Sequence, residues 1–171
     1  MARELLILRH AKSAWDTDAP SDYERPLSRR GRKAAPRVGR YLNQQNLIPD
    51  FVISSPATRA RQTVIAVCEE MDIEPDQITW DERIYGAWTS TLLDVLRQSP
   101  EQARRVMIAG HNPGLEMLLL ELCNENVRIA DDGKLMPTAA VAQLEITSPW
   151  SDVKRGSGQL LSLTRARSLP E

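Results

Sequence analysis

The 171-residue sequence is poor in cysteine and histidine, with two of each, and it has no long hydrophobic run. Cys68 and Cys123 lie far apart in apolar, helix-like stretches, which favours small core residues over a disulfide or a metal site. The first apolar segment ends at once in arginine and histidine, so it is too short for a signal peptide or a membrane span. We therefore expect a cytoplasmic protein in a reducing compartment.

The sequence also has no strong excess of charge of either sign. Lys and Arg total 22 against 23 Asp and Glu, a formal net charge of −1, which argues against nucleic acid or a membrane as partner. Any positive site must be local. The basic stretch from Arg29 to Arg40 is interpreted as a solvated helix face, with docking of an acidic or phosphorylated partner as the alternative. The length fits one domain over residues 1–171.

Short apolar runs bounded by polar residues predict buried strands at Leu5–Leu8, Phe51–Ile53, Val106–Ala109 and Val141–Ile146, with Gln77–Trp80 and Gln159–Thr164 as further candidates. Apolar residues at three- and four-residue spacing predict helices over Ser28–Gln45, Pro56–Met71, Thr89–Gln98 and Pro113–Asn124. We expect Pro36 to kink or shorten the first helix. The alternation of strand and helix predicts an α/β fold with a largely parallel sheet.

Both histidines, His10 and His111, stand where an apolar strand runs into a loop. In open α/β sheets, ligands bind beyond the carboxyl ends of the strands. A single histidine at a strand end usually has a structural role, but here both histidines of the chain lie at strand ends, which favours a catalytic role. After His111, Asn112 is a predicted N-cap and Pro113 a first helical residue, so a helix N-terminus that attracts anions is expected beside His111.

A third strand end, Ser54-Ser55-Pro56, leads into a helix that carries Arg59 in its first turn or so. From there the Arg59 guanidinium can reach the same sheet edge as Arg9, and paired arginines suit a phosphoryl group because each offers a planar fork of donors. The two arginines would hold the phosphoryl group, one histidine would attack it in line, and the other would stabilise its charge. This chemistry needs neither a metal nor a cofactor.

These residues resemble the histidine phosphatase superfamily, also called phosphoglycerate mutase-like. Its Arg-His-Gly hallmark reads Arg9-His10-Ala11 here, Ser54 to Thr63 is similar to its second signature, and Gly110-His111 is similar to its third. The resemblance implies a three-layer sandwich around a largely parallel sheet. It also implies that His10 becomes phosphorylated, that Arg9 and Arg59 bind the phosphoryl group, and that His111 completes the pocket.

The segments Arg-His-Ala-Lys-Ser and Gly-His-Asn-Pro-Gly-Leu most resemble the SixA-type phosphohistidine phosphatases within that superfamily. The resemblance implies a phosphorylated protein bearing phosphohistidine as substrate, or else a small phosphate ester. Asp16 departs from the family, since many members have a phosphate-contacting asparagine there. Its carboxylate would repel phosphate, so either Asp16 points away or the loop runs differently.

Many members carry a glutamate general acid in the segment corresponding to Asp81–Trp88, but the register places Gly86 at that position. Phosphohistidine suits a site without this acid, because a protonated phosphoramidate expels a better leaving group than an ester does. Glu82 is the candidate general acid if the loop is shifted, and an ordinary surface carboxylate is the alternative.

Two other functions stay open at this point. One is a broad phosphatase or mutase of small phosphate esters, although the chain length argues against a mutase. The other is a non-catalytic phosphate-binding module, to which Asp16 and Gly86 give some support. A metal site built from the two histidines and two cysteines is the weakest alternative, because no paired spacing brings two ligands together on one element.

Overall fold

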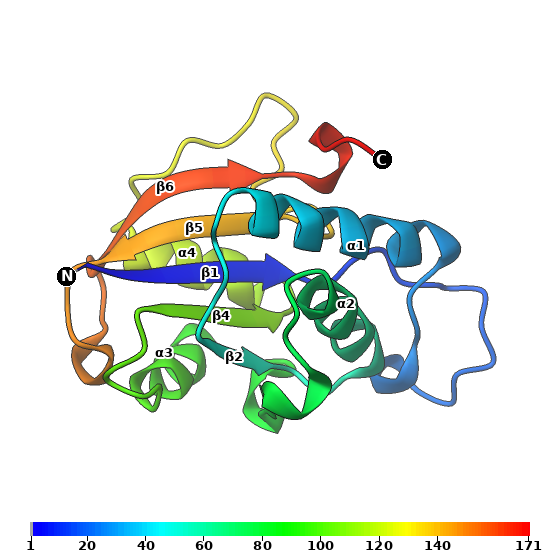
Figure 1. Ribbon diagram of the computed structural model, residues 1–171, viewed down its shortest axis with the longest axis horizontal. Coiled ribbons are helices and arrows are strands. Elements are labelled where there is room, and N and C mark those ends of the chain that lie inside the picture. The colour runs from blue at the N-terminus through cyan, green and yellow to red at the C-terminus, as the bar shows by residue number, and fades with distance from the viewer. Residues whose placement is uncertain (1) are drawn as a thin grey trace.

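The computed structural model describes residues 2–171, and its centre is a six-stranded sheet in the order β3-β2-β4-β1-β5-β6 (Figure 1). The strands are β1 (Arg3–Arg9), β2 (Phe51–Ser54), β3 (Ile78–Trp80), β4 (Arg105–Gly110), β5 (Val141–Ile146) and β6 (Gly158–Thr164). β1, β2, β3 and β4 pair in parallel, whereas β5 runs antiparallel to both of its neighbours. The predicted α/β class with a largely parallel sheet is confirmed.

Four α-helices connect the strands: α1 (Arg29–Gln44), α2 (Thr58–Glu69), α3 (Thr89–Arg97) and α4 (Gly114–Leu122). Ser28 caps α1, as its side chain accepts a hydrogen bond from the Gly31 N–H. α1 continues through Pro36, so the expectation that this proline shortens the helix is wrong. The buried face of α1 packs against α2 and the sheet, and this packing outweighs one missing backbone hydrogen bond.

The starts of α2 and α4 differ from the sequence prediction. α2 begins at Thr58 rather than Pro56, and α4 begins at Gly114 with Pro113 as its N-cap residue. The Asn112 side chain does not cap α4, because its amide donates instead to the carbonyl of Met136 at 2.8 Å. A tertiary contact has therefore replaced the local cap that the sequence favours.

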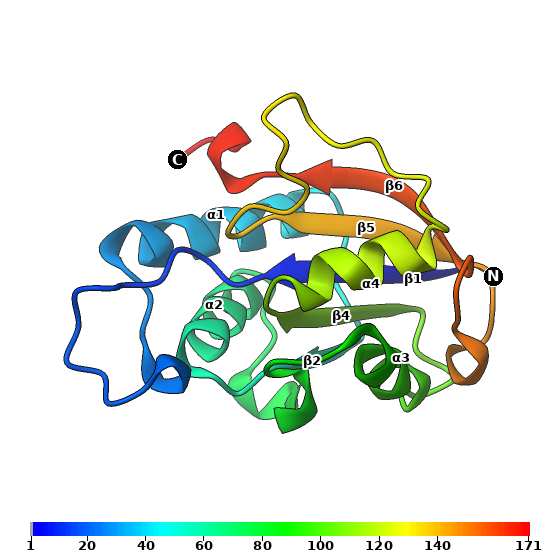
Figure 2. The same ribbon diagram turned by 180° about the vertical axis from the view of Figure 1, so that it is seen from behind.

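The helices form two layers that enclose the sheet. α1 and α2 cover one face in Figure 1, and the reverse view in Figure 2 shows α3 and α4 on the other. Alternate residues of β1 feed the two cores, since Leu5 and Ile7 pack toward α3 and α4 whereas Leu6 and Leu8 pack toward α1 and α2. None of the helices within residues 2–171 is long and apolar enough to cross a bilayer.

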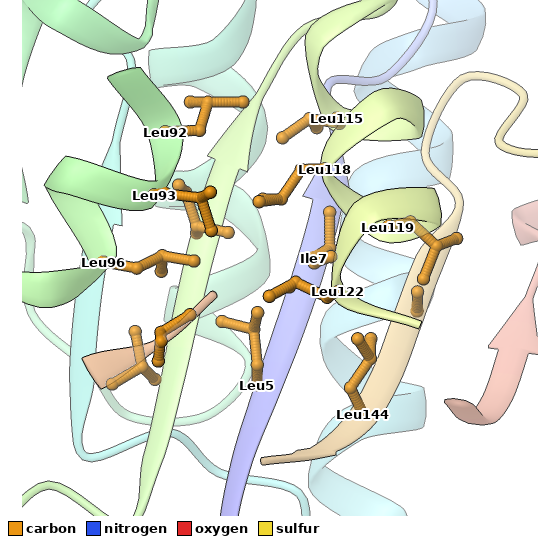
Figure 3. Close-up of a cluster of buried hydrophobic side chains, with 14 of the residues drawn as sticks. Leu5, Ile7, Leu92, Leu93, Leu96, Leu115, Leu118, Leu119, Leu122 and Leu144 are labelled. Atoms are coloured by element: carbon orange, nitrogen blue, oxygen red, sulfur yellow. The ribbon is translucent and has the colours of Figure 1, made fainter. Parts of the chain in front are cut away.

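The core beneath α3 and α4 is built mainly from leucine (Figure 3). Leu92 and Leu96 of α3, Leu118 of α4 and Ile7 of β1 belong to this one cluster, and all four side chains are fully or almost fully buried. His111 lies in the short turn between β4 and α4, three residues before α4 begins. The packing of this leucine cluster therefore fixes the position of one edge of the candidate site.

Shortening Leu118 tests this packing. We expect Leu118→Ala to lower the free energy of unfolding by about 2–5 kcal/mol, because it removes a fully buried side chain and leaves a cavity. The neighbouring Met117 is 45% exposed, so Met117→Ala should cost less than about 1 kcal/mol. Urea denaturation of both variants measures the difference, and equal losses would contradict the packing described.

Candidate active site

Three neighbouring parallel strands end at the same edge of the sheet, and each leads into a polar residue. In sheet order, β2, β4 and β1 run into Ser55, His111 and His10. Backbone hydrogen bonds continue past the strand ends, from the Ser55 N–H to the Ala109 carbonyl and from the His10 N–H to the Gly110 carbonyl. The sheet itself therefore holds these residues at its carboxyl edge, where open α/β sheets bind ligands.

His10 has one ring nitrogen held by the backbone and one left without such a bond. Its Nδ1 lies 2.7 Å from the carbonyl oxygen of Ala11. A carbonyl only accepts, so Nδ1 carries the proton and Nε2 keeps a free lone pair. Only 7% of His10 is exposed, and this burial, together with the nearby Arg59 and Arg9 charges, lowers the pKa of His10 to about 4. The ring is therefore neutral and held in one orientation at neutral pH.

His111 lies beside His10, with 5.3 Å between the two ring centroids. Its Nε2 is 2.8 Å from the hydroxyl of Ser55. The rings of Tyr85 and His111 pack in a T-shaped arrangement, with their centroids again 5.3 Å apart. Burial is the main reason that the pKa of His111 falls to about 3, and the charge of His10 adds to it. Both imidazoles are therefore neutral in the ligand-free protein.

Arg9 precedes His10, and its half-buried guanidinium connects β1 to the loop before β5. Its Nη1 donates to the carbonyl of Met136 at 2.9 Å, and the carboxylate of Glu116 in α4 accepts from the Met136 N–H at 2.8 Å. Burial lowers the pKa of Arg9, and the nearby Glu116 charge opposes that shift. Arg9 is thus a desolvated cation held beside the histidines.

Arg59 lies in the first turn of α2 and is only 6% exposed. It donates through Nη1 to the carbonyl of Asp22 at 2.7 Å and through Nη2 to the Asp22 carboxylate at 3.0 Å. One turn further along, the buried Thr63 hydroxyl accepts from the Ala11 N–H at 3.0 Å and donates to the Arg59 carbonyl at 2.7 Å. Thr63 therefore ties the start of α2 to the loop that follows His10.

Asp22 gathers three donors at the mouth of the site. Its carboxylate accepts from the Tyr85 hydroxyl at 2.6 Å and from Arg25 Nε at 3.1 Å, besides its bond with Arg59. The Tyr85 hydrogen bond and the two guanidinium groups lower the pKa of Asp22 to about 2, so it is ionised. The carboxylate occupies Arg59 in the ligand-free protein, so a bound oxyanion would compete with it for that guanidinium.

Several buried polar atoms at this edge have no hydrogen-bond partner. Six such side-chain atoms occur among residues 2–171, and four belong here: Arg9 Nε, Arg59 Nε, His111 Nδ1 and Asn112 Oδ1. Unpaired buried polar atoms are rare in native proteins, and a cluster of them calls for an explanation. Two guanidinium N–H groups and two neutral imidazoles in one place suit a tetrahedral oxyanion.

The four site residues singled out from the sequence, His10, His111, Arg9 and Arg59, lie in one region, since the charges of both arginines lower the pKa of both histidines. Their roles in phosphate chemistry stay predictions at this point. The placement favours those roles because cation, nucleophile and second imidazole share one desolvated edge.

Glu82, the candidate general acid, is exposed in the 3₁₀ turn Glu82–Ile84, and its carboxylate makes no hydrogen bond or ion pair with another residue of the described chain. Asp16 is exposed as well and makes no such contact with the described site residues.

Cys68 packs in the core under α1 and α2, and Cys123 in the core under α3 and α4. The sheet separates the two thiols, which rules out one metal site holding both. Residues 2–171 contain no cluster of three or more metal-ligating side chains.

The sequence reasoning missed Asp22, Tyr85 and the role of Ser55. Asp22 lies in the long loop between β1 and α1, in the run Asp22-Tyr23-Glu24-Arg25, whose three charged residues in four are the one available signal. Tyr85 stands one residue before Gly86, so the segment examined for an acid does reach the site, through a phenol instead. Such contacts depend on how two loops meet, and local patterns do not encode that.

A family model for the histidine phosphatase superfamily, branch 1, matches residues 5–118. The chain belongs to this superfamily. The matched segment contains His10, Arg9, Arg59 and His111, so it spans the strand ends just described. The sequence-based recognition of a histidine phosphatase is therefore confirmed.

Solved structures place this histidine phosphatase in the SixA-type branch. It is similar to a proposed phosphohistidine phosphatase SixA from Nakamurella multipartitia, with a TM-score of 0.82, 25% identity and 96% of each chain covered. The corresponding protein from Agrobacterium tumefaciens gives a TM-score of 0.81 and 26% identity over 96% of this chain and 99% of that one. The expected phosphoglycerate mutase-like sandwich is confirmed.

Sequence relatives agree with this placement. An uncharacterised protein of Mycobacterium tuberculosis is 30% identical over 158 residues, which cover 90% of this chain and 96% of the relative. A 2,3-bisphosphoglycerate-dependent phosphoglycerate mutase of Bifidobacterium longum is 36% identical over 93 residues, but these cover only 51% of this chain and 38% of the mutase. Similarity to the mutase is thus partial, whereas similarity to the mycobacterial protein extends along the chain.

The lowered histidine pKa values can be measured directly. In phosphate-free buffer, nitrogen NMR of labelled protein should show His10 titrating near pH 4 and His111 near pH 3, below their ordinary value of 6.5. Between these values and 6.5 the unfolded chain binds more protons than the folded one, so stability falls as the pH drops through that window. Titration of either ring near pH 6.5 would contradict the desolvated site.

Proposed function

We propose that this histidine phosphatase is a metal-independent protein phosphohistidine phosphatase that works through a phosphorylated His10. The observation that carries the proposal is the fixed tautomer of His10, with Nδ1–H bonded to the Ala11 carbonyl and Nε2 free, beside the buried guanidinium of Arg59 and the half-buried one of Arg9. A nucleophilic histidine needs a free lone pair, a fixed orientation and a low pKa, and His10 has all three.

In the first step, the Nε2 lone pair of His10 attacks phosphorus in line. The new N–P bond forms as the bond from phosphorus to the substrate imidazole breaks, and that electron pair leaves with the imidazole. In the second step, a water oxygen attacks phosphorus, the N–P bond breaks and its electron pair returns to Nε2. The proton lost by water passes to solvent, and inorganic phosphate leaves.

The charged and polar groups at the sheet edge would stabilise the transferring phosphoryl group. Arg9 and Arg59 supply donors for its equatorial oxygens, and the ring of His111 lies beside that of His10, with 5.3 Å between the centroids. When phosphate binds, its oxygens displace the Asp22 carboxylate from Arg59. Tyr85 and Arg25 still donate to that carboxylate, so the displaced Asp22 keeps two hydrogen-bond donors.

Phosphohistidine is the proposed substrate because its leaving group does not need a general acid. A protonated phosphoramidate expels neutral imidazole, whereas an alkoxide leaving group requires a general acid worth ~10²–10⁴ in rate. In the described chain no carboxyl group with a raised pKa lies beside His10, and ionised Asp22 cannot donate a proton. The similarity to proteins named as SixA phosphohistidine phosphatases gives further support.

A protein substrate also suits the surroundings of His111. A shallow pocket next to it is lined by Ala87, Trp88, Pro113 and Met117, among other residues. The Trp88 side chain is 74% exposed there, and a large exposed aromatic beside a polar site is typical of a contact surface for a macromolecule. The leaving imidazole would remain attached to its own protein, which would rest on this surface.

The decisive experiment measures phosphate release in the presence of a chelator, from a phosphohistidine-bearing protein and from a small phosphate ester. We expect wild type to release phosphate much faster from phosphohistidine, and His10→Ala to lower the rate at least ~10³-fold. Release only from the ester would instead indicate a broad phosphatase. No release from either substrate, with phosphate still bound, would support the non-catalytic binding module.

A matched pair of arginines on α2 provides the control. Arg59→Gln should lower kcat/KM by at least about tenfold, because it removes a charged ligand of the phosphoryl group. Arg61 lies on the same helix but stacks on Trp80, with its guanidinium carbon 4.4 Å from the ring centroid, so Arg61→Gln should change kcat/KM by less than about twofold. Equal losses in both variants would contradict the assignment of Arg59.

A further inference from the structure

A strongly basic cavity of about 280 Å³ lies outside the catalytic residues just described. Seven cationic side chains line it against a single carboxylate, Asp132, and they are Lys12, Arg30, Lys33, Arg37, Lys134, Arg165 and Arg167. Neither His10, His111, Arg9 nor Arg59 lines this cavity. The whole protein carries a formal charge of −1, so this concentration of positive charge is local and requires its own explanation.

Four segments distant in the sequence build the cavity, and the first is the loop after β1, which contributes Lys12. α1 contributes Arg30, Lys33, Ala34 and Arg37, which share one helix face because they are spaced by three and four residues. The loop between α4 and β5 contributes Asp132 and Lys134, and the chain beyond β6 contributes Arg165 to Arg167. The basic stretch of α1, which its sequence favours as a solvated face, therefore forms one wall of a concavity.

Protein carboxylates neutralise only part of this charge. Asp132 accepts from Arg165 at 2.6 Å and from Arg167 at 3.2 Å, and Glu171 lies 3.3 Å from Arg37. Within residues 2–171, no carboxylate lies within 4.0 Å of the remaining four cations, Lys12, Arg30, Lys33 and Lys134. Unpaired like charges facing one cavity repel each other, so their arrangement lowers stability unless an anion binds.

The cavity adjoins the catalytic site through shared backbone. Lys12 follows His10 by two residues, and its carbonyl accepts from the Ser28 N–H at the start of α1. Pro137 and Thr138, which line the cavity, follow Met136, the residue whose carbonyl accepts from Arg9. The His10 carbonyl in turn accepts from the Ala139 N–H. Two chain segments therefore separate the two sites and contact both.

We propose that this basic cavity is a second anion site, which binds a chain of two or more phosphate groups from a small molecule. Several charges on connected phosphates match four free cations better than one orthophosphate does, because each added phosphate meets a further cation. The concave shape favours a compact small ligand over an extended protein surface. The site is separate from the proposed phosphatase chemistry and does not depend on it.

The test is calorimetric titration of tripolyphosphate and orthophosphate into the full-length protein at physiological salt. Wild type should bind tripolyphosphate at least about tenfold more tightly than orthophosphate. Lys33→Glu combined with Lys134→Glu should weaken tripolyphosphate binding at least about tenfold, since it reverses two unpaired charges that line the cavity from different segments. Tripolyphosphate binding no tighter than that of orthophosphate would overturn the proposal.

A control variant with the same change in net charge distinguishes specific binding in the cavity from nonspecific electrostatic attraction to the whole protein. Arg104 and Lys154 are exposed, and both lie near the amino end of β1, at the sheet edge opposite the histidines. Arg104→Glu combined with Lys154→Glu should change the tripolyphosphate affinity by less than about twofold. A loss equal to that of the Lys33 and Lys134 variant would show that only the overall charge matters and would overturn the site.

Two further titrations distinguish this cavity from its alternatives. Arg59→Gln should keep tripolyphosphate binding within about twofold of wild type, and a large loss would place the ligand in the catalytic pocket. An oligoglutamate peptide of equal charge should bind at least about tenfold more weakly than tripolyphosphate. Equal affinity would favour an acidic protein segment and overturn a phosphate site. Neither result depends on turnover, so failure here leaves the phosphatase proposal intact.

Discussion

The arrangement depends on one constraint, which is that β2, β4 and β1 are parallel neighbours whose carboxyl ends meet at one edge of the sheet. Each of these strands is short and buried, and each leads into a polar residue, so Ser55, His111 and His10 are fixed in a row. The two hydrophobic cores, of which the one under α3 and α4 is rich in leucine, pack against both faces of the sheet that carries this edge. The positions of the residues at this edge are therefore set by hydrogen-bonded backbone rather than by flexible loops.

The second determinant of the site is the burial of its ionisable side chains. Burial keeps both imidazoles neutral, while the ionised Asp22 at the mouth bonds the Arg59 guanidinium. The same protein collects a second set of cations between α1 and its C-terminal segment, with four of them unpaired within the described chain. Positive charge is thus divided between a desolvated pair at the histidines and an exposed group in the neighbouring cavity.

Much of this could be predicted from the sequence, because apolar runs and the residues that end them are local signals. All six strands and the positions of His10, His111, Arg9 and Arg59 follow from such runs and from motif spacing. The starts of α2 and α4 did not follow, since Asn112 bonds Met136 instead of capping its helix. Asp22 and Tyr85 were also missed, because their place in the site depends on a hydrogen bond between residues 63 positions apart in the sequence.

The central claim is that His10 carries the phosphoryl group during turnover, and the most direct test is to trap that intermediate. Wild type mixed with a phosphohistidine-bearing protein, quenched with alkali within milliseconds and mapped by mass spectrometry should show phosphate on His10 alone. His111, whose Nε2 faces the Ser55 hydroxyl, should stay unmodified and serves as the internal reference. Phosphate on His111, or rapid turnover with no phosphorylated histidine at any time point, would contradict the account.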